Sequence, residues 1–306
     1  MKEKILSPKS DFIFKLIFGN DNNKDVLASF LQSILDLPDG EYTHLTIVDP
    51  HLQRKTVNDK LGILDVKIHT TTGKVIDVEI QVLSNFPQMR ERILFYSSKM
   101  ITEQIQSGDG YEKIKRVICI VITNYPLIRE NEAYHNRYFL YDKKTGSQFS
   151  DILEINTLEL PKLPDITDDS GLWDWMQFLR TEREEDYTML AKKNPKIKKA
   201  FHALIELSQD EETRMMYESR EKARRDEHAR MQAAIKEGLE RGQTEGMAKG
   251  IAEGRAEGMA KGIAVGRTDT IVETVKTALQ MQMKIEDIMK LTKLTREEIA
   301  DISKRN

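Results

Sequence analysis

Residues 61–82 alternate apolar and polar side chains in two short runs separated by a turn, and this pattern predicts a β-hairpin. Successive side chains of a strand point to opposite faces of the sheet. One face of the hairpin therefore carries only apolar side chains, namely Leu64, Val66, Ile68, Ile76, Val78, Ile80 and Val82. The opposite face carries polar side chains, namely Asp65, Lys67, Asp77, Glu79 and Gln81.

The register of this hairpin brings two carboxylates together. Both apolar rows face one core if a three-residue loop, residues 71–73, joins the strands with Gly73 in the left-handed conformation. Asp65 then lies opposite Glu79, with Cβ atoms about 4.5–5.5 Å apart. A divalent cation between two such carboxylates would relieve their repulsion, and Mg²⁺ binds one or two carboxylates together with water and phosphate oxygens. The alternative is a solvated sheet face on which Lys67 neutralises Asp77.

The elements around the hairpin follow a recognisable order. Residues 10–19 and 24–35 predict two helices before it, and residues 89–106 predict a helix after it, with apolar side chains at helical spacing. Residues 116–123 are almost continuously apolar, as expected of a strand buried on both faces. Helix, strands, helix and buried strand is the core order of the PD-(D/E)XK restriction-endonuclease-like fold, an α/β fold in which helices flank a mixed sheet.

The chain resembles the recombination-promoting nuclease (Rpn) and transposase-like family of PD-(D/E)XK proteins. The resemblance covers most of the chain, and its matching segments are residues 11–15, the Asp65 hairpin, and residues 79–81, 92–96, 110–111 and 158–161. It implies a Mg²⁺-dependent DNA endonuclease that hydrolyses phosphodiester bonds, with Mn²⁺ or Ca²⁺ as alternative ions. It also implies a link to DNA recombination or mobile elements.

The resemblance assigns roles to five residues. Asp65 and Glu79 match the metal-binding carboxylates, and Asp11 matches an acidic residue of the first helix. Gln81 stands where many relatives of the fold have lysine, a substitution that is common in this family. Glutamine can orient water or a ligand by hydrogen bonds, but it carries no charge. Lys67, on the same face as Asp65, is a candidate helper that would supply the charge.

Composition narrows the class of protein. The net charge of −3 argues against a generally basic surface, so DNA binding would need a local basic groove. The densest basic run, residues 192–199, is a candidate for phosphate contact, and a solvated helix end is the alternative. The chain has one cysteine and no apolar run as long as a membrane span, which favours a cytoplasmic protein without membrane contact.

Glycine recurs at every fourth position from Gly238 to Gly266. Each glycine costs a helix about 1 kcal/mol relative to alanine, so an isolated helix is disfavoured here. The charged residues between the glycines exclude a membrane-spanning helix pair. A flexible or conditionally helical spacer is one interpretation of this repeat. Self-association of two helices through the glycine groove, giving a homo-oligomer through the helical C-terminal region, is the other.

These patterns divide the chain into four expected parts. They are a nuclease-like core at residues 1–165, a helical extension at 166–235, a glycine-repeat spacer at 236–267 and a small helical module at 268–306. The last part resembles a helix-turn-helix pair, with a capping box at residues 295–298. A metal-dependent DNA endonuclease is the first hypothesis. A catalytically inactive DNA-binding or self-assembling protein is the second, motivated by the missing lysine and the long tail.

Overall fold

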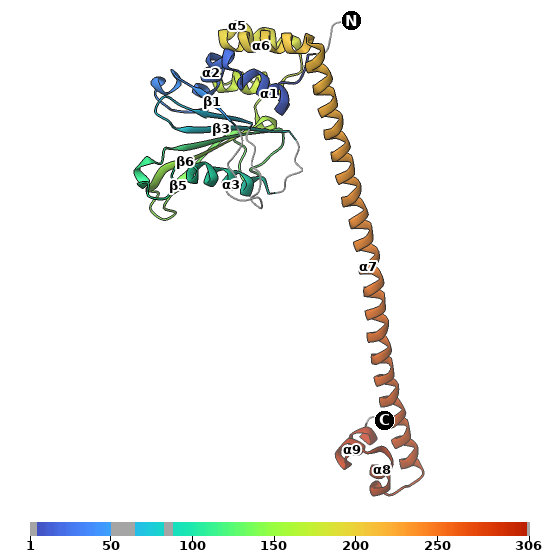
Figure 1. Cartoon of the computed structure of the whole chain (residues 1–306). Coiled ribbons are helices and arrows are strands. Elements are labelled where there is room, and N and C mark those ends of the chain that lie inside the picture. The colour runs from blue at the N-terminus through green and yellow to red at the C-terminus, as the bar shows by residue number, and fades with distance from the viewer. Residues whose placement is uncertain (1–4, 50–64, 83–87, 305–306) are drawn as a thin grey trace. The chain divides into compact units, whose positions relative to one another are not determined.

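The computed structural model describes residues 5–49, 65–82 and 88–304, and it confirms the α/β fold (Figure 1). The sheet consists of β1 (Thr46–Val48), β2 (Val66–His69), β3 (Val75–Gln81), β4 (Val117–Thr123), β5 (His135–Tyr141) and β6 (Gln148–Glu159). The helices before and beside the sheet are α1 (Asp11–Phe18), α2 (Lys24–Ile34) and α3 (Met89–Thr102). The later helices are α4 (Gly171–Arg180), α5 (Glu184–Lys193), α6 (Pro195–Gln209), α7 (Glu211–Gln280), α8 (Ile285–Thr292) and α9 (Arg296–Lys304).

The described strands form one mixed sheet in the order β1-β2-β3-β4-β6-β5. β4 pairs in parallel with both β3 and β6, whereas β1, β2 and β5 are joined to their neighbours by antiparallel pairing. All seven residues of β4 are buried, which confirms the expectation of a strand covered on both faces.

Two helical layers of unequal size cover the sheet (Figure 1). The larger core lies on the side of α1, α2 and α4–α6, where the rings of Phe18, Phe30 and Trp175 pack together. On the other side α3 packs against β3 and β4 through residues such as Met89 and Ile93. The carboxylate-bearing face of the hairpin is therefore the face that α3 covers.

The hairpin has the register that the sequence predicts. Val66 lies opposite Val78 and Lys67 opposite Asp77. Gly73 adopts φ 84°, a left-handed conformation that costs glycine little. Buried Glu41 stabilises the turn, because the hydroxyl group of Thr72 donates to its Oε1 atom at 2.7 Å.

The chain divides into two compact units, Met1–Arg225 and Asp226–Asn306. Helices α4–α6 share the core of the sheet within the first unit. In the second unit the end of α7 packs with α8 and α9 around Val275, Ala278, Ile288 and Ile299. The capping box is present there, since the backbone N–H of Thr295 donates to Glu298 Oε2 at 2.8 Å. The four-part division expected from the sequence stays a prediction.

The glycine repeat is helical. α7 runs without interruption from Glu211 to Gln280, so the repeat has the helical form rather than the flexible form of the expected spacer. Its role as a spacer stays a prediction. Ion pairs one helical turn apart stabilise such a solvated helix by about 0.2–0.5 kcal/mol each. An example is the pair of Lys261 and Glu257, whose N and O atoms lie 2.6 Å apart. No described helix combines the length and the apolar character needed to cross a membrane.

Candidate active site

Asp65 is held at the end of the hairpin by two contacts. It directly precedes β2, and its Oδ2 atom accepts a hydrogen bond from the backbone N–H of Ile80 at 2.8 Å. Its Oδ1 atom lies 2.9 Å from Nζ of Lys15 in α1. Burial raises the pKa of Asp65, against the opposing effect of the Lys15 ammonium. The carboxylate is thus fixed in place, and the Lys15 ammonium offsets only part of the cost of removing it from water.

Glu79 lies on β3 beneath α3 and is almost fully buried. Its Oε2 atom forms an ion pair with Nη2 of Arg92, 3.2 Å away, whereas Oε1 is buried and has no hydrogen-bond partner among the described residues. Burial and the charge of Asp65 raise the pKa of Glu79 to about 7, although Arg92 acts in the opposite direction. The charge of Asp65 therefore disfavours the ionised form of Glu79.

Asp77 is a third carboxyl group on the same face. It is fully buried, and its Oδ1 atom has no hydrogen-bond partner in the part of the chain that the structure describes. Burial, together with Glu79 and Asp65, raises its pKa well above the usual value. The alternative of a solvated sheet face is wrong, because α3 covers these side chains. Lys67 lies opposite Asp77 but forms its ion pair with Glu103, at 3.3 Å.

The other predicted residues take peripheral positions. Gln81 is the last residue of β3, two positions after Glu79 and on the same face of the sheet. Asp11 is the first residue of α1; its side chain is half exposed, and one carboxylate oxygen lies 4.0 Å from Nη1 of Arg220. The charge of Asp11 raises the pKa of Asp65, which places Asp11 at the edge of the same cluster.

Lys15 and Arg92 are two further cations of this cluster, and the sequence patterns gave neither of them a role beside the carboxylates. Each belongs to a segment that carries the family resemblance, residues 11–15 and 92–96. In α3, Tyr96 lies four residues after Arg92, and the guanidinium of Arg92 lies 5.1 Å from the centre of its ring. In α1, Asp11 lies four residues before Lys15, so that the two residues share a face of the helix. The i,i+4 spacing within those two segments is the sequence signal that could have identified Lys15 and Arg92 as members of the cluster.

The carboxylates suit a cation that takes few protein ligands. Within residues 5–49, 65–82 and 88–304, no three His, Cys, Asp or Glu side chains come together in a complete metal site. Mg²⁺, however, needs only one or two carboxylates and keeps several waters. The unpartnered Oε1 of Glu79 and the mutual repulsion of Glu79 and Asp65 fit such an ion.

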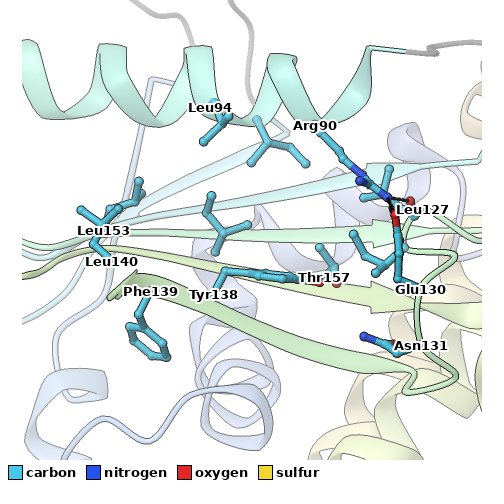
Figure 2. A pocket seen from close by; sticks show the side chains of 13 residues that line it. Arg90, Leu94, Leu127, Glu130, Asn131, Tyr138, Phe139, Leu140, Leu153 and Thr157 are labelled. Carbon is cyan, nitrogen blue, oxygen red and sulfur yellow. Dashed lines mark hydrogen bonds and ion pairs between the residues drawn. The ribbon is translucent and has the colours of Figure 1, made fainter. Parts of the chain in front are cut away.

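A separate hollow of about 540 Å³ lies between α3 and the strands β5 and β6. Figure 2 shows Arg90 and Leu94 of α3 on one side and Tyr138, Leu140 and Leu153 of the sheet on the other. None of the predicted site residues lines it. Its walls are mainly apolar, and Arg90 is neutralised by Glu130 at 3.1 Å, so this hollow does not suit a phosphate backbone.

The basic run at residues 192–199 is partly neutralised. Lys196 and Lys199 both bind the carboxylate of Asp25, with N to O distances of 2.8 and 2.6 Å. Phosphate contact by this run stays a prediction.

The family model of the PD-(D/E)XK nuclease family transposases matches residues 8–234. The chain belongs to that family. No curated protein and no solved structure matches the chain. For a PD-(D/E)XK family transposase, nuclease chemistry and a link to mobile elements are expected, and DNA is the substrate that the family implies. The matched region contains the whole sheet and every residue of the candidate site.

Proposed function

We propose that this protein is a divalent-metal-dependent DNA endonuclease that acts in recombination or in the movement of mobile elements. The observation that supports this most is the pair of fixed, nearly buried carboxylates of Asp65, directly before β2, and Glu79, on the adjacent strand β3. Stability alone does not explain two mutually repelling carboxylates in one cluster, whereas a cation site does.

Asp65 and Glu79 would hold the ion, with Mg²⁺ as the first choice and Mn²⁺ or Ca²⁺ as alternatives. When bound, such an ion lowers the pKa of a coordinated water and polarises the scissile phosphate. The backbone N–H of Ile80 orients Asp65, and Arg92 orients Glu79. Gln81 is positioned to hold water or substrate by hydrogen bonds, while Asp11 and Lys67 act on the cluster through their charges.

Purified full-length protein and its Asp65→Ala variant test this proposal with supercoiled plasmid in Mg²⁺, Mn²⁺, Ca²⁺ or EDTA. We expect the wild type to nick or linearise plasmid in Mg²⁺ or Mn²⁺ and to be inactive in EDTA. The variant should lose at least about 100-fold in rate, as expected when a transition-state contact is removed. Equal cleavage by both proteins would place the activity elsewhere, or in a contaminant.

The second candidate function is that of an inactive DNA-binding or self-assembling protein. Gln81 in place of lysine favours it, because β3 then supplies no ammonium to the site. A folded wild type that binds DNA but cleaves none in any of these ions would support this candidate over the first.

We further propose that the protein forms a homo-oligomer through α7. The supporting observation is a row of exposed apolar side chains, each directly after a glycine of the repeat: Leu239 at 62%, Met247 at 71%, Ile251 at 49%, Met259 at 70% and Ile263 at 49% exposure. The glycines have open space around them, so a second helix could approach closely. Rows of residues four apart are the ridges and grooves that crossed helices use for packing.

Alanine at Gly250, Gly254 and Gly258 tests this oligomer. On a single helix each alanine should fit, since nothing lies within 4 Å of the added Cβ, and each should stabilise the helix by about 1 kcal/mol. Between packed helices the added methyl groups should instead weaken association at least about tenfold. Light scattering over a concentration series measures the outcome, with Glu253→Ala and Glu257→Ala as the control. A variant with more helix and unchanged mass would contradict the oligomer.

A further inference from the structure

The candidate site contains an ammonium group that does not come from the strand. Lys15 of α1 lies 2.9 Å from Oδ1 of Asp65, and its side chain is 36% exposed. Gln81 of β3, at the position where many relatives of the fold have lysine, carries no charge. The cluster therefore has a lysine beside its first carboxylate, but this lysine is supplied by a different element.

We propose that Lys15 takes over the role of the missing lysine and contacts the scissile phosphate. This inference rests on the proposed nuclease function. Among the cations of the cluster, Lys67 is paired with Glu103, and both side chains are only 13% exposed. Arg92 lies deeper than Lys15, against Glu79 and the ring of Tyr96. Lys15 is the more accessible of these cations and the one paired with Asp65.

The position of Lys15 is well defined by the fold. Its neighbours in α1, Ile13, Phe14 and Ile17, are fully buried in the main core, so the helix has little freedom to shift. Asp65 is itself fixed by the backbone N–H of Ile80. Both partners of the ion pair are thus held by rigid parts of the structure, as positioning at a reacting group requires.

The chemistry needs a cation that keeps its proton. In hydrolysis a water oxygen forms a bond to phosphorus, the bond from phosphorus to the leaving sugar oxygen breaks, the water loses a proton and the leaving oxygen gains one. The Lys15 ammonium exchanges no proton in this scheme. It has three N–H donors, of which Asp65 uses one, and it can donate another to a non-bridging phosphate oxygen whose negative charge it balances.

Lys15 and a metal ion would share the Asp65 carboxylate. Removing the ammonium should therefore leave metal binding unchanged or make it tighter, while DNA contact and cleavage decline. If Lys15 had only a structural role, its removal would damage the site and weaken metal binding and DNA binding together. This difference separates the two roles by measurements that need no cleavage.

The test uses Lys15→Cys in the full-length protein, because the only other cysteine, Cys119, is buried. Bromoethylamine converts the new thiol into an amine of nearly lysine length, whereas iodoacetamide adds a neutral group of similar size. We expect Lys15→Cys to cleave plasmid about 100-fold more slowly and to bind a short duplex in Ca²⁺ about tenfold more weakly. Aminoethylation should restore most of both losses, and carbamidomethylation should restore neither. Lys24→Cys, which removes an exposed lysine paired with Asp21, is the matched control and should behave like the wild type.

The outcomes distinguish this inference from the proposed function. If the wild type cleaves and Lys15→Cys cleaves equally well, the inference is overturned and the nuclease stands. If the wild type never cleaves but Ca²⁺-dependent DNA binding still depends on the amine at residue 15, the nuclease proposal fails and the contact of Lys15 with phosphate stands. Loss of DNA and Mn²⁺ binding together, without recovery on aminoethylation, would make Lys15 a structural residue and overturn the inference.

Discussion

Glu79→Gln is expected to reduce Mg²⁺-dependent plasmid cleavage by at least about 100-fold, with the fold retained. Glutamine has the shape of glutamate and can still accept a hydrogen bond from Arg92, so the packing beneath α3 should survive. It lacks the negative charge that a divalent ion needs as a ligand. Cleavage rates, together with thermal unfolding in EDTA and in Mg²⁺, measure the effect. Full activity in this variant would exclude Glu79 as a metal ligand.

The pH dependence of the wild type provides the control for this variant. The pKa of Glu79 is raised from 4.5 to about 7, so the folded protein retains a proton that the unfolded chain releases. In EDTA this group therefore contributes its full stability below pH 4.5 and loses that contribution as pH rises through about 7. Mg²⁺ binds the ionised form, so its stabilising effect should increase over the same range. Glu79→Gln should weaken both trends, because its side chain does not titrate, and should leave the part that the raised pKa values of Asp65 and Asp77 contribute.

The hairpin shows what the sequence could predict about this site. Alternation along the two strands and a glycine in the turn were sufficient to fix the register, and the observed pairs Val66–Val78 and Lys67–Asp77 agree with it. These are local signals, since they depend on residues within one short segment. The family resemblance, which the match to residues 8–234 confirms, extended the prediction to the whole fold.

The surroundings of the carboxylates could not be predicted in the same way. Alternation distinguishes two faces of a strand, but it does not tell which face a later helix will cover. α3 covers Asp77 and Glu79, and α1 delivers Lys15 to Asp65, because of how whole elements pack. Contacts between residues 15 and 65 depend on that packing, which the local pattern does not contain.

The glycine repeat shows the limit of intrinsic propensity. Glycine disfavours helices, so the sequence predicts a flexible or conditionally helical spacer, or a helix interface, and α7 is helical through the whole repeat. Alanines, i,i+4 ion pairs and apolar residues between the glycines favour the helix in compensation. A second helix packed along the row of exposed apolar side chains would stabilise the α7 helix further.

Trp175→Ala is expected to destabilise the first compact unit by about 3–5 kcal/mol, a large fraction of the stability of a typical domain. Trp175 is fully buried, and its ring centre lies 5.7 Å from those of Phe18 and Phe30 and 5.8 Å from that of Phe178. Removing it leaves a large cavity where α1, α2 and α4 meet. Because α1 carries Lys15, the damage should reach the candidate site as well.

Urea unfolding, followed by circular dichroism and by a second probe in the sheet, measures this loss. Tyr111→Ala is the control, because Tyr111 is 80% exposed and its removal should change stability by less than about 0.5 kcal/mol. Trp175→Phe should cost less than Trp175→Ala, since it keeps a ring in place and removes an indole N–H for which the described residues offer no hydrogen-bond partner. A cost below about 1 kcal/mol for Trp175→Ala would mean that α4 does not belong to the same cooperative core as the sheet.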